Sequence, residues 1–431
     1  MSPDTNSQVL SFEAARHVVE EHAKALRPRG RELLSLLDAV DRVVAEPIHA
    51  DRNIPPFPRA TRDGYAVKSA DVQNVPANLE VIGEIKAGGE IRELPPLASG
   101  QAIAVMTGAP VPDGADAVLM IEHTSRDGDR LDITKPVSEG ENIVPAGAEG
   151  RKRDLLLPAG TRLEYAAIGV AAAVGRSRVL VYERPKVAVL STGDEVVDID
   201  VPPGPYQIRN SNSYSLAAQI HAAGGETLIL PIAPDEPVRL RELLAEALDC
   251  DLVLIAGGVS MGKYDLVEQE LAALQAAFFF TGAKIQPGKP IVFGRIPCPA
   301  HSTPSLGSVA QDRLHPDVEQ KYFFGLPGNP VSTMVTFEIF AKACVEALAG
   351  LAPEPLRFLQ AKLRTRIRTK TGLKRFLPAQ LSGEFENAEV ELTRWQGSGD
   401  IASVARSNCY LVIPPDCEEI EAGEWVPVLL R

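Results

Sequence analysis

The pattern of apolar and polar residues changes twice along the chain. Residues 11–26 place apolar side chains at helical spacing after Ser11, a residue type that often caps helices, which predicts an amphipathic helix. From about residue 47 to residue 183, short runs of Val, Ile and Leu are interrupted by Pro and Gly. This punctuation favours short strands and tight turns, so we expect a small β-rich domain there.

A regular alternation of strand-like and helix-like segments begins at residue 185. It predicts a mostly parallel sheet with helices on its faces, in which ligands bind where the strands end. Two further strands and a long helix to about residue 350 complete this α/β domain. Residues 353–358 resemble a linker, and the alternation in 359–431 predicts a terminal β domain. The α/β prediction rests on strands within 185–195, 226–231 and 251–258 and on helices within 212–225, 235–248 and 265–277.

Composition narrows the classes of function. A net charge of −13 repels polyphosphate backbones and anionic lipids, so we expect no nucleic-acid partner and no membrane partner. The five cysteines form no C-x-x-C pair, which indicates a reducing compartment and no structural zinc. The first ten residues lack the features of a signal sequence, and no apolar run approaches the roughly 20 residues that span a bilayer. We therefore expect a cytoplasmic protein.

Polar residues gather where the predicted strands end. In "STGDE" (191–195), acidic side chains follow a turn at Gly193, and the alternative is a solvated acidic turn. In "AGGVSMGKYD" (256–265), glycines allow backbone N–H groups to form an anion nest and Ser260 adds a hydroxyl. Asp265 is a candidate to hold a metal or a ligand amine, or it caps the helix that follows.

Two further loops favour an anionic ligand. In "GLPGNPVS" (325–332), Pro330 predicts the first helical position and Ser332 lies in the first turn, so free N–H groups suit a phosphate. In "QPGKP" (286–290), Lys289 follows a turn and suits an oxyanion. The alternatives are a well-capped helix and a solvated lysine. Together the loops indicate a phosphorylated or nucleotide-like ligand with a divalent cation, and catalysis by positioning and charge stabilisation.

The order of these motifs resembles that of the MoeA family, the molybdopterin molybdenumtransferases, which include the E domain of gephyrin. The similarity runs nearly from end to end of the chain. The matching segments are "PPFPRATRDGYAV" (55–67), "VMTGAPVPDGADAV" (105–118), "STGDE" (191–195), "GGVSMGKYD" (257–265), "PGKP" (287–290), "GLPGNPVS" (325–332) and "QGSGDIASVARSN" (396–408).

The resemblance implies a multidomain α/β and β architecture and a homodimer. It also implies a reaction in which adenylylated molybdopterin and molybdate are consumed with Mg²⁺, AMP is released and molybdenum remains on the dithiolene. The molybdopterin adenylyltransferase is then a candidate partner. The implied domains are residues 1–46 with 151–184 as an elongated dimerisation segment, 47–150 as an inserted β-rich domain, 185–352 as a MogA-like parallel α/β sheet domain that binds molybdopterin, and 353–431 as a C-terminal β barrel.

Roles for individual residues also follow from the resemblance. Asp63 and Thr107 approach the α/β domain of the partner subunit. An acidic cluster of Glu195, Asp235 and Asp265 organises Mg²⁺, with Glu195 and Asp265 as metal ligands; Asp235 is alternatively a helix cap. Lys289 is assigned a place beside the molybdate. The residues expected to bind the pterin, its phosphate or the oxyanion are Gly257, Gly258, Ser260, Gly262, Gly288, Pro290, Gly328, Asn329, Ser332, Ser398 and Ser403.

The chain departs from the family pattern in several places. Gln286 stands where similar proteins often have a lysine, although Lys284 points to the same side of a strand. The arginine of a G-R-x-x-F motif is replaced in "TGLKRF" (371–376), which leaves Lys374 or Arg375 as substitutes. Residues 59–62 differ from the usual segment before Asp63. Residues 296–320 form an insertion whose polar, Pro-rich and Ser-rich composition predicts a surface loop.

Two other functions compete with molybdenum insertion. The first is adenylyl transfer to molybdopterin, which the additional domains at residues 1–184 and 359–431 disfavour. The second is a scaffold that binds the pterin without turnover, which the altered Gln286 and 373–375 positions permit. The acidic residues favour turnover, since a pure binder of phosphate has no need of carboxylates beside it.

Overall fold

The computed structural model describes residues 9–88, 95–258, 266–299 and 318–431. The chain divides into two compact units. The larger unit comprises the described residues of Met1–Leu33, Asp41–Ala45 and Leu180–Arg431, and the smaller unit comprises those of Leu34–Val40 and Glu46–Val179. Strands β2 (Arg31–Ser35) and β13 (Arg178–Tyr182) each contain residues of both units.

A six-stranded sheet with the order β17-β14-β18-β23-β22-β19 forms the centre of the larger unit. Four of its strands run parallel: β17 (Glu226–Ile229), β14 (Lys186–Ser191), β18 (Leu252–Ala256) and β23 (Val318–Leu326). Strand β22 (Val292–Pro299) runs in the opposite direction and pairs antiparallel with both β23 and the edge strand β19 (Ala277–Phe280). The predicted α/β sheet is therefore confirmed, with an antiparallel edge.

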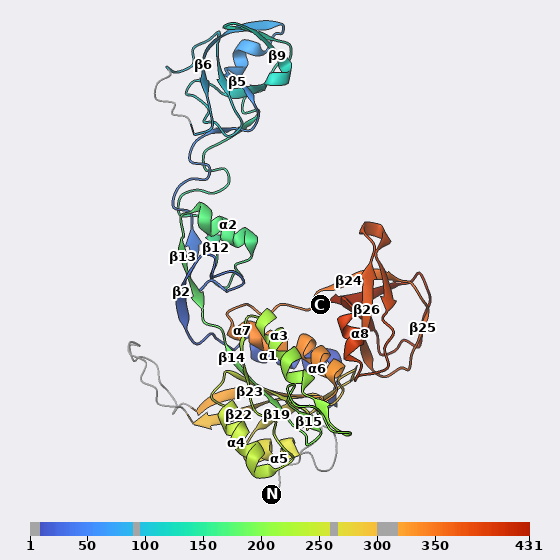
Figure 1. The fold of residues 1–431 in the computed structure, drawn as a ribbon. Coiled ribbons are helices and arrows are strands. Elements are labelled where there is room, and N and C mark those ends of the chain that lie inside the picture. The colour runs from blue at the N-terminus through green and yellow to red at the C-terminus, as the bar shows by residue number, and fades with distance from the viewer. Residues whose placement is uncertain (1–8, 89–94, 259–265, 300–317) are drawn as a thin grey trace. The chain divides into compact units, whose positions relative to one another are not determined.

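Helices cover both faces of this sheet (Figure 1). All five residues of β18 are buried, as a strand covered on both faces requires. One face carries α1 (Phe12–Ala23), α3 (Ser211–Ala222), α6 (Pro330–Thr336) and α7 (Lys342–Leu348), with a π-helical turn at Phe337–Ala341 between the last two. The other face carries α4 (Pro237–Ala247) and α5 (Leu266–Ala273).

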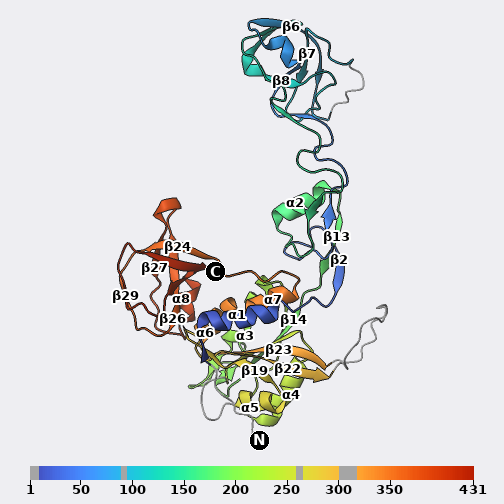
Figure 2. The same cartoon turned by 180° about the vertical axis from the view of Figure 1, so that it is seen from behind.

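A closed β barrel follows the α/β part (Figure 2). The pairing of β26 with both β27 and β28 closes the ring, which confirms the predicted C-terminal barrel. Strand β21 (Ile285–Gln286), from the α/β part, pairs with the outer side of β26. The barrel strands are β24 (Phe358–Leu363), β26 (Lys374–Ser382), β27 (Glu389–Leu392), β28 (Cys409–Ile413) and β30 (Trp425–Leu430), with β25 (Ile367–Arg368), β29 (Glu419–Ile420) and α8 (Ile401–Ala405) beside them.

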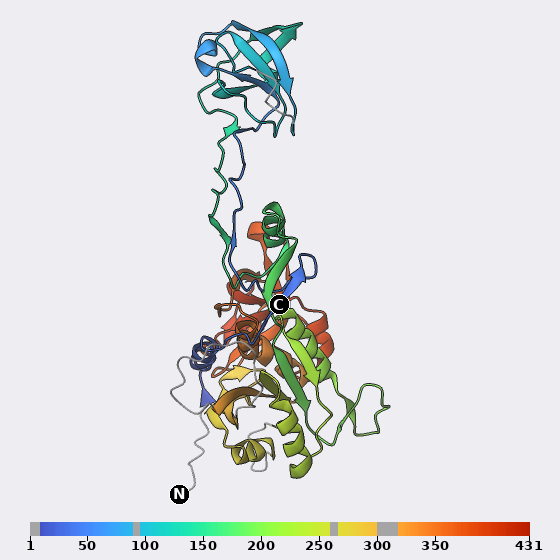
Figure 3. The ribbon, with the colours of Figure 1, turned by 90° about the vertical axis from the view of Figure 1, so that its left-hand side faces the viewer.

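The smaller unit contains a second six-stranded sheet, with the order β8-β5-β7-β6-β10-β9, which curves around its own apolar core (Figure 3). This sheet confirms the predicted β-rich domain. Its strands are β5 (Gly64–Val67), β6 (Ala77–Ile85), β7 (Gln101–Val105), β8 (Ala117–Met120), β9 (Thr124–Asp127) and β10 (Arg130–Ile133). The unit also contains β3 (Ile48–His49), β4 (Arg59–Ala60), β11 (Ile143–Val144), β12 (Leu155–Leu157) and α2 (Tyr165–Ala173). Across the described parts of both units, no helix is long and apolar enough to cross a membrane.

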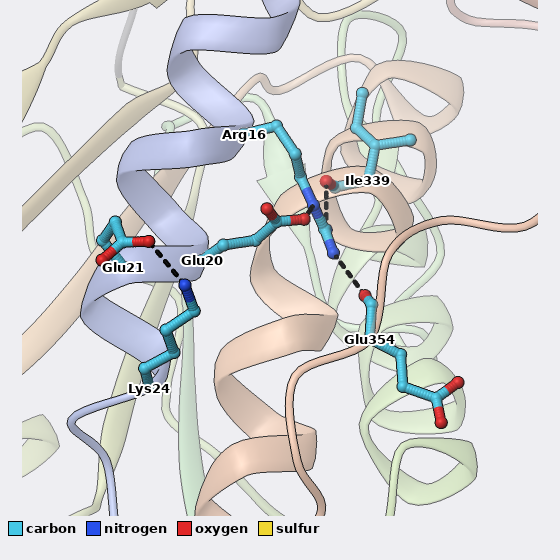
Figure 4. Close-up of polar contacts among 6 residues, drawn as sticks. All are labelled: Arg16, Glu20, Glu21, Lys24, Ile339 and Glu354. Atoms are coloured by element: carbon cyan, nitrogen blue, oxygen red, sulfur yellow. Dashed lines mark hydrogen bonds and ion pairs between the residues drawn. The ribbon is translucent and has the colours of Figure 1, made fainter.

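A buried arginine fastens helix α1 to the α/β part. The helix begins after Ser11, whose hydroxyl accepts the N–H of Ala14 at 3.1 Å, as the sequence predicts. Arg16 is only 7% exposed, and its Nε donates to Glu20 at 2.6 Å. Its terminal nitrogens donate to the carbonyl oxygens of Ile339 at 2.7 Å and Glu354 at 3.2 Å (Figure 4). One guanidinium thus satisfies two main-chain carbonyls far away in the sequence.

Substituting Arg16→Ala should therefore lower the free energy of unfolding by about 2–4 kcal/mol. The substitution leaves the partly buried Glu20 carboxylate and the carbonyls of Ile339 and Glu354 without their hydrogen-bond donor. The matched control is Lys24→Ala, which removes the exposed ion pair of Lys24 with Glu21 on the same helix and should cost less than about 1 kcal/mol. Denaturant titration of both variants measures the difference. Equal losses would show that Arg16 does not fasten the helix.

Candidate functional site

A cavity of about 450 Å³ lies at the carboxyl edge of the parallel strands. Its floor is formed where β14, β18 and β23 end, at Thr192, Gly257 and Pro327. The first residues of α3 and α6 also line it. Ligands of parallel α/β sheets bind at this edge, so the cavity is the candidate site.

The cavity brings together predicted residues from five separate loops. Asp194 lies among them, since its carboxylate accepts the main-chain N–H of Asp235 at 3.1 Å. Helix α4 begins at Pro237 after Glu236, so the alternative that Asp235 caps this helix is wrong. The predicted residues that line the cavity are Glu195, Asp235, Gly257, Gly258, Pro290, Gly328 and Asn329.

The carboxylates at this cavity repel one another. Burial raises the pKa of Asp235, and the negative charges of Asp194 and Glu195 raise it further. No group of three or more His, Cys, Asp or Glu side chains within the described ranges is arranged to hold a metal ion. The arrangement is nevertheless one that a cation stabilises, since a positive charge would favour the ionised form of Asp235.

The two glycines at the end of β18 fit closely over Thr192. Gly257 and Gly258 have φ values of +98° and +62°, which glycine adopts readily. A Cβ on Gly258 would lie 2.6 Å from Val267 Cγ2 and 2.8 Å from Thr192 Oγ1. The hydroxyl of Thr192 is buried and has no hydrogen-bond partner among the described residues. A buried hydroxyl at the wall of a cavity is a group that a ligand can satisfy.

The sequence reasoning missed three residues of this site. Thr192 belongs to the "STGDE" segment, in which the prediction rests on Gly193 and the acidic residues. Arg209, which lines the cavity, supplies a positive charge, and its Nε donates to the carbonyl of Ile199 at 3.1 Å. Asn212 donates to the carbonyl of Gly328 at 2.7 Å and so joins the start of α3 to the loop before α6. The polar "RNSNS" segment (209–213) is the sequence signal that could have indicated the last two.

Some predicted binding residues lie elsewhere. Ser332 is buried in the first turn of α6 and does not line the cavity. Ser403, the alternative to Ser398 as an oxyanion donor, is fully buried, and its hydroxyl donates to the carbonyl of Asp400 at 2.6 Å. Ser398 is half-buried, and its carbonyl accepts the N–H of Val331 at 2.9 Å, which places it beside the start of α6.

The "PGKP" turn lies between the cavity and the barrel. Gly288 has a φ of +106°, and a Cβ there would lie 2.4 Å from Thr336 Cγ2, so only glycine fits. Pro290 lines the cavity, whereas Lys289 is exposed and does not line it. Ser260, Gly262 and Asp265 lie outside the described residues, as do residues 300–317 of the predicted insertion.

In the smaller unit, the structure brings Asp63 and Thr107 together. The N–H and the hydroxyl of Thr107 donate to the same oxygen of Asp63, at 2.6 and 2.9 Å. These bonds lower the pKa of Asp63. The neighbouring Gly64 is required by packing, because a Cβ there would lie 1.9 Å from the carbonyl oxygen of Leu119. Two separate sequence motifs thus form one contact.

Three family models cover the chain in succession. They are the MoeA N-terminal region (domain I and II) over residues 10–175, the probable molybdopterin binding domain over 188–347, and the MoeA C-terminal region (domain IV) over 360–430. The chain belongs to the MoeA family.

Relatives of this MoeA family member match it over most of its length. The molybdopterin molybdenumtransferase of a Nostoc species is 33% identical over 92% of this chain and 88% of its own length. The Staphylococcus aureus (strain COL) protein of the same name is 30% identical over 92% and 90%. The crystal structure of the MoeA protein from Pyrococcus horikoshii matches with a TM-score of 0.75 and 27% identity, over 98% of this chain and 100% of that one.

The close fit at Gly258 gives a stability test. Gly258→Ala should lower the free energy of unfolding by about 3 kcal/mol or more, from the strain of a positive φ and from overpacking against Thr192 and Val267. Gly423→Ala is the matched control, since Gly423 also has a positive φ of +89° but open space around it. Its cost should stay near 1–2 kcal/mol. Thermal and denaturant unfolding of both variants measure the two losses of stability. Equal losses for Gly258→Ala and Gly423→Ala would refute the packing argument.

Proposed function

We propose that this chain inserts molybdenum into adenylylated molybdopterin, using molybdate and releasing AMP. Curated relatives that bear the name of this activity match this chain over nearly their whole length. The single observation that carries the proposal is the cavity at the sheet edge, which Glu195 and Asp235 line together with the glycines that follow β18. Neither competing function is favoured, because the relatives named as transferases match the N-terminal and C-terminal regions as well as the α/β domain.

Each group at the cavity has a role in this reaction. Gly257 and Gly258 leave room for the pterin or its phosphate, and the Thr192 hydroxyl donates to the ligand. Arg209 attracts the phosphate oxygens. Glu195 and Asp235 are the candidate ligands of Mg²⁺, which would neutralise charge while water cleaves the phosphoanhydride bond between the adenylate and the phosphate of the pterin and AMP leaves. Asp265 remains a third candidate ligand.

Dimerisation is part of the proposal, and helix α2 supports it. Its sequence, "YAAIGVAAA", contains no charged residue. The exposed positions, Tyr165, Ala166, Gly169, Ala172 and Ala173, recur at helical spacing and so share one face. Tyr165 is 89% exposed. A second copy of the chain would cover this face, and Asp63 with Thr107 would then act on the partner's α/β domain.

Gly169→Arg tests the dimer. A Cβ at Gly169 meets nothing within 4 Å, so the substitution fits the free chain but charges the apolar face. We expect a dimer for the unsubstituted protein and a monomer for the variant, by sedimentation equilibrium. Ser125→Arg, at an exposed position of β9, is the control and should stay dimeric. A dimeric Gly169→Arg would exclude this face as the interface.

The remaining partner and location assignments follow from the same function. The enzyme that adenylylates molybdopterin must supply the substrate, so contact with it is part of the proposal. We assign the protein to the cytoplasm, in keeping with Cys250, Cys344, Cys409 and Cys417, which form no disulfide in the described structure.

The activity is tested by AMP release from adenylylated molybdopterin with Mg²⁺ and graded molybdate. The unsubstituted protein should release AMP in a molybdate-dependent manner. Glu195→Gln and Asp235→Asn should each lower kcat by about 100-fold, since each removes a charge that organises the reacting phosphate. Glu236→Gln, next to Asp235 but outside the cavity lining, is the matched control and should keep full activity. Tight pterin binding without AMP release at any molybdate concentration would refute the proposal in favour of a scaffold.

A further inference from the structure

Three buried polar side chains form a closed ring of hydrogen bonds at the wall of the cavity. Ser191 is the last residue of β14, Asn210 precedes α3, and Ser213 lies in the first turn of α3. Their exposed fractions are 3%, 5% and 0%. The Ser191 hydroxyl donates to Asn210 Oδ1 at 3.1 Å, and Asn210 Nδ2 donates to Ser213 Oγ at 3.0 Å. The two serine oxygens lie 2.9 Å apart.

The direction of every hydrogen bond in this ring is determined by its neighbours. The main-chain N–H of Ser213 donates to Asn210 Oδ1 at 3.1 Å, which fixes that atom as the acceptor and caps α3. Because the Ser191 hydroxyl hydrogen points at Asn210, the hydrogen between the two serine oxygens belongs to Ser213. Each side chain therefore donates once and accepts from its neighbour. A buried network that is satisfied in this way is rigid.

The ring is attached to the segment that carries Glu195. Strands β15 (Val196–Val197) and β16 (Ile208–Arg209) pair in parallel, directly after Glu195 and directly before Asn210. The first N–H of β16 donates to the carbonyl of Glu195 at 2.8 Å. The N–H of Asn210 donates to the carbonyl of the last residue of β15, also at 2.8 Å. Asn210 thus holds the main chain on which Glu195 lies.

The ring is also attached to the segment that leads to Asp235. The carbonyl of Ser191 accepts the N–H of Ala233 at 2.8 Å, and the carbonyl of Ala233 accepts the N–H of Gly193 at 3.2 Å. Asp235 follows two residues after Ala233. One small ring of side chains therefore connects the two loops whose carboxylates line the cavity.

We propose that this hydrogen-bonded ring positions the carboxylates of Glu195 and Asp235. The negative charges repel one another, so a fixed separation between them must be imposed by the loops that carry them. Directional hydrogen bonds impose it better than apolar contacts, which have no preferred direction. Ser213 is a positioning residue, because it is fully buried and does not line the cavity. Identification of the cation between the carboxylates as Mg²⁺ rests on the proposed function.

Ser213→Ala tests the ring, because it removes the bond to Ser191 and leaves the main-chain cap of α3 in place. Calorimetry with Mg²⁺ alone should show a Kd raised about 10-fold, the usual effect of losing a residue that orients metal ligands. The kcat for AMP release should fall on the order of 10-fold, with the KM for adenylylated molybdopterin unchanged. Ser215→Ala is the matched control. It removes a hydroxyl of the same helix that donates to the carbonyl of Asn212 at 3.0 Å, and it should change neither quantity.

A double-mutant cycle shows whether the ring acts through a carboxylate. In the Glu195→Gln background, Ser213→Ala should cause no further loss of kcat, because a positioning residue has no effect once the group that it positions is gone. Independent losses, in which the two substitutions multiply, would overturn the inference for Glu195.

The outcomes separate this inference from the proposed function. A lower melting temperature of Ser213→Ala with unchanged Kd and kcat would overturn the inference and give the ring a structural role. Equal effects of Ser213→Ala and Ser215→Ala would also overturn it, as would an absence of Mg²⁺ binding by the unsubstituted protein. Mg²⁺ binding that Ser213→Ala weakens, without any AMP release by the unsubstituted protein, would support the inference and refute the proposed function.

Discussion

Parallel pairing of β14, β18 and β23 is the constraint on which the rest of the larger unit depends. Strand β18 is buried throughout and contains only apolar side chains, so it offers no chemistry along its length. Polar groups can appear only where the strands end, and parallel strands all end at the same edge. Glu195, Asp235 and the Gly257–Gly258 pair are thereby placed around one cavity although they are far apart in the sequence.

The same sheet also supports the C-terminal barrel. Helix α1 and the inward residues of α6 and α7 share one apolar cluster with Phe376, Tyr410 and Val412 of the barrel. Strand β21 adds to β26 by main-chain pairing, and the carbonyl of Ser398 accepts the N–H of Val331 at 2.9 Å. The barrel is therefore packed against the α/β part through both apolar and polar contacts, and its residues can contribute to the site at the sheet edge.

Much of this arrangement could be predicted from the sequence because strand exits carry short-range signals. Gly193 and the "GLPGNP" loop indicate a turn and a helix start from residues that are close together in the sequence. Side-chain partners and strand pairings that depend on the folded chain leave no such signal in the sequence. The hydroxyl of Ser403 is already engaged by the carbonyl of Asp400. Two other features depend on tertiary contacts: the antiparallel pairing at the edge of the sheet and the pairing of Gln286 with Arg375. The buried Thr192 hydroxyl became notable only once its lack of a partner was visible.

The central claim is that one cavity couples loss of the adenylate to delivery of molybdenum. The most direct test counts both products in the same reaction: AMP by chromatography and molybdenum retained on the isolated pterin by elemental analysis. The account predicts equimolar AMP and pterin-bound molybdenum at every molybdate concentration. Release of AMP without molybdenum on the pterin, or molybdenum uptake without AMP, would contradict it.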